Sequence, residues 1–196
     1  MGVLPVRQVE PFEPLVSLYE NQGLTLPRLG TLPADEMPQP YRRLLVHAEA
    51  MTPTLEEFFG QRLGLRVLDS HVSATTVRRQ VVLAGTRDER PVEFGAIRID
   101  LSCFDEQPRE LLRQGRVPLG RLLGDVKIAF VCQPLLFFRV GADRIMRWSL
   151  GMEAAGQDLY GRCNRILSLD GRVMADVVEI LAPVREARHG QTSVAV

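Results

Sequence analysis

The sequence predicts an α+β fold, in which a mainly antiparallel sheet carries a few packed helices. Apolar residues recur at helical spacing from Leu55 to Leu63, and Gly64 ends this pattern. From Leu65 onward the apolar period changes to two, which is typical of strands. Later in the chain, Asp170-Gly171 separates two alternating segments and indicates a tight hairpin turn.

The first 40 residues are predicted to form an N-terminal arm, because prolines at 27, 33, 38 and 40 interrupt them. A short helix is favoured within this arm at residues 13–21. The main domain is predicted to span residues 41–184, and its first long helix is expected to begin at Thr52. There Thr52 would cap the helix, Pro53 would occupy its first turn and Glu56 would complete the cap. Residues 185–196 are polar and predicted to be a flexible tail.

The remaining elements follow from alternation and turn residues. Strands are expected at 65–69, 75–84 and 91–101, and the polar turn 85–90 would join the last two as a hairpin. Short helices are expected at 109–114 and 119–123. Two further hairpins are predicted, one around Gln133-Pro134 and one across Asp170-Gly171, with these strands: 127–132, 135–140, 162–169 and 172–181. Residues 146–154 do not fit helical spacing or strand alternation clearly.

Composition disfavours several classes of function. Lys+Arg and Asp+Glu number 24 each, so no basic excess predicts a nucleic-acid partner. The three cysteines and three histidines show no metal-ligand spacing, so no metal or other cofactor is expected. No signal sequence or apolar run of spanning length is present, and the chain is expected to be cytoplasmic without membrane contact. Phosphate loops and nucleophile elbows are also missing. A small molecule is therefore the expected partner.

Alternation turns two charged residues inward. Arg79 shares its strand face with Val77, Val81 and Leu83, where an unpaired guanidinium would cost several kcal/mol. Glu179 is the sole polar member of the face that holds Val173, Ala175, Val177 and Leu181. The two side chains could simply pair with each other or with backbone groups. Alternatively, they could face a pocket, with Arg79 binding a ligand carboxylate and Glu179 binding a hydroxyl.

Two more arginines are candidates for ligand binding. Arg165 shares a face with Cys163 and Leu167, although it could equally extend to solvent at the end of its strand. Arg121 follows Pro118 and Leu119 at a predicted helix start, where free N–H groups could meet an anion. A simple proline-initiated helix explains that segment as well.

The same residues occur in segments that resemble the bacterial chorismate lyase family, in that family's order. The match spans about residues 41–183 and depends on the ordered combination of short motifs. The matching segments are Ala50-Met51-Thr52, Arg79-Gln80-Val81-Val82-Leu83, Pro118-Leu119-Gly120-Arg121-Leu122-Leu123, Leu159-Tyr160-Gly161-Arg162 with Arg165, and Glu179-Ile180-Leu181-Ala182-Pro183.

This resemblance implies a chorismate lyase-like antiparallel sheet of six strands, or slightly more, with helical flaps over a buried ligand. It implies a carbon–oxygen lyase, independent of metal and cofactor, that removes pyruvate from chorismate to leave 4-hydroxybenzoate for ubiquinone or aromatic-acid biosynthesis. Arg79 and Glu179 would be the catalytic residues, and Arg79 would bind the product carboxylate. Backbone at Met51 and Leu119 would assist, and Arg121 or Arg165 would hold the enolpyruvyl carboxylate.

The chain departs from the family in one region. The segment 122–160 is longer than in the enteric-type enzyme, and Tyr160 replaces a tryptophan. Two alternatives therefore stay open: a lyase for a related enol ether, or a non-catalytic carrier or sensor of an aromatic acid on the same fold. Product formation would separate the enzymes from the sensor. The sequence does not distinguish a monomer from a homodimer.

Overall fold

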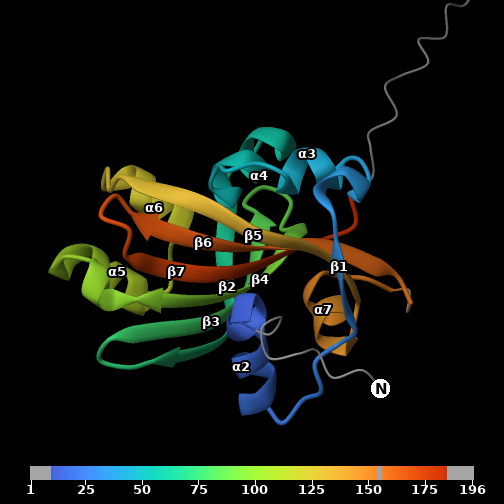
Figure 1. Cartoon of the computed structure of the whole chain (residues 1–196), viewed down its shortest axis with the longest axis horizontal. Helices are drawn as coiled ribbons and strands as arrows, with labels where there is room; N and C mark the ends of the chain where they lie inside the picture. The colour runs from blue at the N-terminus through green and yellow to red at the C-terminus, as the bar shows by residue number, and fades with distance from the viewer. Residues whose placement is uncertain (1–9, 154–155, 185–196) are drawn as a thin grey trace, which may run out of the picture.

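Seven antiparallel strands form one sheet in the computed structural model, which describes residues 10–153 and 156–184 (Figure 1). Their order across the sheet is β1-β5-β6-β7-β4-β3-β2. The strands are β1 (Leu29–Leu32), β2 (Leu63–Val72), β3 (Thr76–Gly85), β4 (Pro91–Asp100), β5 (Phe130–Gly141), β6 (Asp158–Ser168) and β7 (Val173–Leu181). The predicted α+β class is confirmed, and the sheet has one strand more than the six, or slightly more, that were expected.

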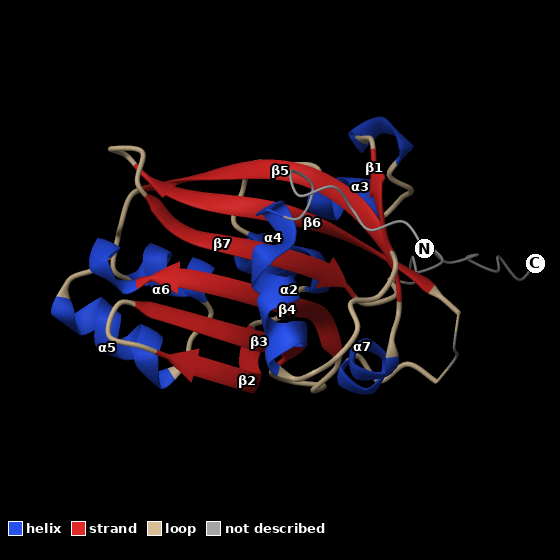
Figure 2. Ribbon diagram, turned by 60° about the horizontal axis from the view of Figure 1, so that its bottom comes forward, coloured by secondary structure: helices blue, strands red, loops and turns tan. Residues whose placement is uncertain are grey.

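Helices cover both faces of this sheet (Figure 2). On one face, α2 (Glu13–Asn21) and α7 (Arg144–Ser149) pack against apolar side chains of the central strands. On the other face lie α4 (Met51–Phe59), α5 (Glu106–Gln114) and α6 (Leu119–Asp125), which also surround the site described below. The short elements are α3 (Tyr41–Leu45), η1 (Glu10–Phe12), η2 (Ala34–Glu36) and η3 (Leu101–Cys103).

The N-terminal segment is integrated into the fold. The helix predicted at residues 13–21 is confirmed as α2, and it buries Leu15, Leu18 and Tyr19 in the core. The Tyr19 hydroxyl donates a 2.7 Å hydrogen bond to Asp143, whose other carboxylate oxygen caps α7. Strand β1 then pairs with residues 137–140 at one edge of the sheet. The predicted division of the chain at residues 40 and 184 stays a prediction, and the tail 185–196 lies outside the described residues.

The hairpin predicted around Gln133-Pro134 is wrong. Residues 130–141 form one continuous strand, β5, which pairs along its length with β6 and has an irregularity between Pro134 and Leu136. Proline has no N–H for the ladder and is tolerated at sheet edges and bulges. Because β1 covers only residues 137–140 of β5, no strand of the described part of the chain pairs with the outer side of β5 at Pro134. The other two predicted hairpins, β3–β4 and β6–β7, are confirmed.

The start of α4 differs from the predicted cap. The helix begins at Met51 after Ala50, and no side chain caps it. Thr52 is buried, and Glu56 instead accepts a 2.9 Å hydrogen bond from the Leu63 amide. Gly60, in the left-handed region at φ +62°, ends the helix. No helix in the described part of the chain is long and apolar enough to cross a membrane.

Candidate functional site

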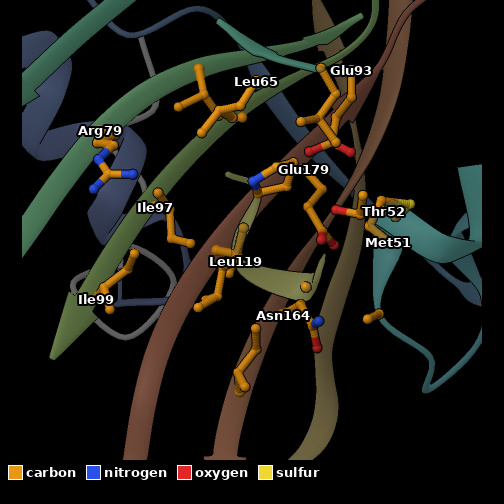
Figure 3. Close-up of a pocket in the computed structure, with 18 of the residues that line it drawn as sticks. Met51, Thr52, Leu65, Arg79, Glu93, Ile97, Ile99, Leu119, Asn164 and Glu179 are labelled. Atoms are coloured by element: carbon orange, nitrogen blue, oxygen red, sulfur yellow. The ribbon is translucent and has the colours of Figure 1, made fainter. Parts of the chain in front are cut away.

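A pocket of about 70 Å³ lies between the sheet and the helices α4, α5 and α6 (Figure 3). Its floor consists of side chains that point to one face of strands β2 to β7, and its rim is formed by the starts of α4 and α6. The walls are mainly aliphatic, from Leu65, Val81, Leu83, Ile97, Ile99, Leu112, Val117, Leu119, Ile166 and Val177. Four buried polar side chains interrupt this apolar lining: Arg79, Glu93, Asn164 and Glu179.

Arg79 is a buried cation on the pocket wall. Arg79 is only 2% exposed, and its Nη2 atom has no hydrogen-bond partner in the part of the chain that the structure describes. Burial lowers the pKa of Arg79 to about 10, so the guanidinium stays charged at neutral pH. A buried charge without a partner is costly, and an anionic ligand would supply the missing interaction.

The C-terminal end of α5 lies against Arg79. Gly115 follows this helix at φ +66°, and a Cβ on it would stand 3.3 Å from Cζ of Arg79. A helix C-terminus carries partial negative charge, which favours a nearby cation. This contact offsets part of the cost of burying the guanidinium, and it leaves Nη2 of Arg79 without a hydrogen-bond partner among the described residues.

Glu179 lies at the other end of the pocket and pairs with Arg162. Arg162 is fully buried, and its Nε donates to Glu179 Oε2 at 2.5 Å. The strand register places them opposite each other on β6 and β7. Glu179 is 6% exposed and lines the pocket. The possibility that Arg79 and Glu179 pair with each other is therefore not realised, because Arg162 is the partner of Glu179.

Glu93 is a second carboxyl group at this end of the pocket. It lies on β4, is 4% exposed, and its Oε2 atom has no hydrogen-bond partner in the described residues. Burial foremost, and then the charge of Glu179, raise the pKa of Glu93 well above its ordinary value, whereas Arg162 lowers it. Figure 3 shows Glu93 and Glu179 on the side of the pocket away from Arg79.

Asn164 adds an amide to the pocket floor. It is 1% exposed on β6, and neither its Oδ1 nor its Nδ2 has a hydrogen-bond partner among the described residues. A buried amide in this state is costly unless a ligand or water satisfies it. No three His, Cys, Asp or Glu side chains within residues 10–153 and 156–184 are grouped so that they could hold a metal ion.

The structure brings four of the six predicted site residues together. Arg79, Glu179, Met51 and Leu119 all line the pocket. Arg121 does not, because its guanidinium pairs with Glu56 and donates to the Leu63 carbonyl at 2.9 Å. Its interactions tie α6 to α4 and β2.

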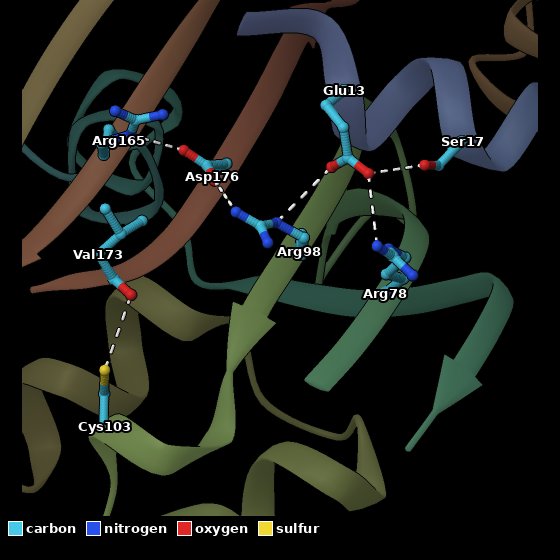
Figure 4. A network of polar contacts seen from close by, with 8 residues as sticks. All are labelled: Glu13, Ser17, Arg78, Arg98, Cys103, Arg165, Val173 and Asp176. Atoms are coloured by element: carbon cyan, nitrogen blue, oxygen red, sulfur yellow. Dashed lines mark hydrogen bonds and ion pairs between the residues drawn. The ribbon is translucent and has the colours of Figure 1, made fainter. Parts of the chain in front are cut away.

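Arg165, the last of the six predicted site residues, lies on the opposite face of the sheet from the pocket. Its Nε donates to Asp176 Oδ1 at 2.8 Å (Figure 4). Asp176 Oδ2 also accepts a 2.6 Å hydrogen bond from Nη2 of Arg98. The Nε atom of Arg98 in turn lies 3.6 Å from Oε2 of Glu13 on α2. This network joins the N-terminal helix to the sheet.

Sequence reasoning missed Glu93, Arg162 and Asn164. Alternation could have found Glu93, because it shares a strand face with Gly95, Ile97 and Ile99. Arg162 and Asn164 lie on the opposite face of β6 from Arg165. The alternation of apolar and polar residues in β6 does not indicate which of its two faces lines the pocket, because both faces are largely buried.

Comparison with solved structures finds similar folds in other proteins. It aligns over 71% of its length with 96% of the effector domain of PhnF from Mycobacterium smegmatis, at TM-score 0.52 and 13% identity. The longer PhnF chain aligns over 65% of its own length and 70% of this chain, at TM-score 0.51 and 13% identity. A ligand-binding domain of a GntR-family transcriptional regulator from Bordetella bronchiseptica aligns over 85% of its length and 61% of this chain, at TM-score 0.46 and 17% identity.

These alignments establish the fold, which is the chorismate lyase-like fold shared with the effector domain of PhnF. No family model and no curated protein matches the sequence. The expectation of a chorismate lyase acting in aromatic-acid biosynthesis is corrected by this comparison, because the aligned PhnF structure is named as an effector domain rather than as an enzyme. The catalytic roles expected for Arg79 and Glu179 are withdrawn with it.

Proposed function

We propose that this chain is a non-catalytic sensor domain that binds a small organic anion in the pocket beside Arg79. The observation that carries this proposal is the buried guanidinium of Arg79, whose Nη2 has no partner in the described residues and which lines a mainly aliphatic cavity. A carboxylate is the group best matched to the planar donors of arginine. The effector domain of PhnF, which has the same fold, gives further support.

The shape of the pocket favours a compact ligand with an apolar body. Its volume is about 70 Å³, and aliphatic side chains from β2, β3, β4 and β7 form most of its wall. Pockets of this kind bind through apolar contact and use a few placed polar groups for orientation. Arg79 would therefore fix one end of the ligand, and the ring or chain of the ligand would lie over Val81 and Ile97.

The test compares benzoate with benzamide, which has the same shape and no charge, by calorimetric titration of the whole chain. Benzoate is expected to bind and to be recovered unchanged, and benzamide is expected to bind at least about tenfold more weakly. Arg79→Met should weaken benzoate binding by about tenfold to a hundredfold, the range for a hydrogen bond to a charged group. Arg42→Met, at an exposed position on α3, is the matched control.

Stability measurements keep this test interpretable. Removal of a buried unpaired charge should leave the free energy of unfolding unchanged or raise it, so loss of binding in Arg79→Met would not reflect unfolding. Equal binding of benzoate and benzamide, or benzoate binding that survives Arg79→Met, would overturn the proposal. Chemical conversion of a bound anion would contradict the non-catalytic role.

A further inference from the structure

The end of the pocket away from Arg79 holds two buried carboxyl groups, Glu93 and Glu179 (Figure 3). They come from β4 and β7, where Gly95 is the register partner of Glu179 and Glu93 lies two residues before Gly95. Both therefore point to the same face of the sheet, and they lie near enough for the charge of Glu179 to raise the pKa of Glu93. One wall thus offers two acidic side chains to whatever occupies the cavity.

The nearby cation, Arg162, is already committed to other acceptors. Its Nε donates to Glu179, its Nη1 donates to the carbonyls of Leu45 and His47, and its Nη2 donates to the carbonyl of Glu49. Arg162 and Glu179 together carry no net charge. Glu93 is left over, with Oε2 buried and without a partner in the described residues.

We propose that the Glu93–Glu179 end of the pocket is a subsite for the protonated amino group of the ligand. This inference rests on the proposed function, in which Arg79 binds the ligand's anionic group. The ligand class is then an amino-substituted organic acid with an ammonium at one end of an apolar body and a carboxylate at the other. Glu93 and Glu179 select the ammonium end.

The donor count favours an ammonium over a hydroxyl group. A hydroxyl group has one hydrogen to donate, whereas an ammonium has three, and two carboxyl groups provide acceptors for more than one. Charge balance favours the same choice, because an ionised Glu93 leaves one negative charge beyond the Arg162–Glu179 pair. An ammonium group would neutralise this charge inside a buried site, where an unpaired charge is costly.

Binding should change the protonation of Glu93. In the free protein burial keeps the proton on Glu93, and the bound ammonium would favour the carboxylate. The proton of the Glu93 carboxyl then goes to solvent, and the ligand keeps all of its own protons. The other titratable groups at this end, among the described residues, include Glu179 on β7, Arg162 on β6 and His47 before α4, whereas Arg79 on β3 lies at the opposite end. Burial and then Arg162 lower the pKa of His47, so His47 is neutral near pH 7.

Three para-substituted benzoates of nearly equal shape test the inference: the aminomethyl, hydroxymethyl and ethyl compounds. The aminomethyl compound should bind the whole chain at least about tenfold more tightly than the other two near neutral pH. Titration in two buffers of different ionisation enthalpy should show proton release for the aminomethyl compound and none for the others. Its affinity should rise with pH until Glu93 ionises in the free protein.

Glu93→Gln keeps the shape of the protonated acid and cannot ionise. It should abolish the preference for the aminomethyl compound and its proton release, and leave hydroxymethyl binding within about twofold. Glu57→Gln, at an exposed position on α4, should change neither result. Arg79-dependent binding of all three compounds with equal affinity would overturn the amine subsite and leave the anion site standing. A preference that survives Glu93→Gln would also overturn it, and no Arg79-dependent binding of any compound would overturn both proposals.

Discussion

The Nε atom of Arg162 lies 2.5 Å from Oε2 of Glu179, on adjacent strands beneath the pocket. The remaining guanidinium nitrogens of Arg162 donate to backbone carbonyls at His47 and Glu49, at 2.9 and 3.0 Å. This segment leads directly into α4, whose first residue, Met51, forms part of the pocket rim. Arg162 therefore neutralises the floor of the site and fixes one side of its entrance at the same time.

Removal of Arg162 is expected to be strongly destabilising. Arg162→Met should lower the free energy of unfolding by about 3–5 kcal/mol, because it leaves Glu179 as an uncompensated buried charge. Urea denaturation near neutral pH measures this change. Arg172→Met is the control, since its pair with Asp170 is exposed to solvent and should contribute little to stability. Equal losses in the two variants would contradict the role given to Arg162.

Gly115 is expected to affect the position of Arg79 as well as the stability of the fold. Gly115→Ala places a methyl group at φ +66° and 3.3 Å from Cζ of Arg79, so it should weaken benzoate binding several-fold. Its left-handed backbone should also cost about 1 kcal/mol of stability. Gly60→Ala has the same backbone strain at φ +62° with open space around it.

The pair of glycine variants separates the two effects. Urea denaturation should show a loss of stability in both variants, larger in Gly115→Ala because its new Cβ also stands 3.3 Å from Cγ2 of Val67. Calorimetric titration should show a loss of benzoate affinity only in Gly115→Ala. If Gly60→Ala weakened binding equally, the contact with Arg79 would not be the cause.

Period-two alternation was sufficient to orient Arg79 and Glu179, because a strand has only two faces. The structure places both side chains inward. The same reasoning assigned Arg165 to the strand face that also holds Cys163, and the structure agrees. This face packs toward α2, however, and not toward the pocket. Alternation tells which residues share a side and does not tell which side holds a cavity, since that depends on where the helices pack.

The sequence also does not predict which charged side chains form ion pairs. The pairing of Arg162 with Glu179 depends on the β6–β7 register, and its contacts with residues 45–49 join segments more than a hundred residues apart. The strand β5 shows a second limit. Gln133-Pro134 has the composition of a turn, yet at the edge of a sheet proline is tolerated within a strand, so the tertiary position overrides the local signal.

Gly161 is expected to tolerate no side chain. A Cβ at this position would lie 2.5 Å from Cζ of Phe138 and in contact with the backbone carbonyl of Glu179. Gly161→Ala should therefore lower the free energy of unfolding by about 3 kcal/mol through overpacking, as measured by urea denaturation. Gly141→Ala, near the end of β5 with no atom within 4 Å of the new Cβ, should have little effect. A loss of the same size at both glycines would point to backbone entropy instead.

Glu93 is expected to make the stability of the free protein depend on pH. Its pKa is raised in the folded state by burial, so between about pH 4, where the unfolded chain ionises, and the higher folded pKa the native state binds more protons. The contribution of Glu93 to stability therefore falls as pH rises through this interval. Glu93→Gln cannot titrate, and its stability relative to the original chain should increase with pH over the same interval.

Urea denaturation of Glu93→Gln and of the original chain, from about pH 5 to about pH 8, measures this difference in the free energy of unfolding. The control Glu57→Gln, at an exposed site, should differ from the original chain by a nearly constant amount over the same range. A difference that stays constant for Glu93→Gln would mean that Glu93 has the same pKa in the folded and unfolded states. In that case Glu93 would already be ionised in the free pocket near neutral pH, and binding of an ammonium ligand would release no proton.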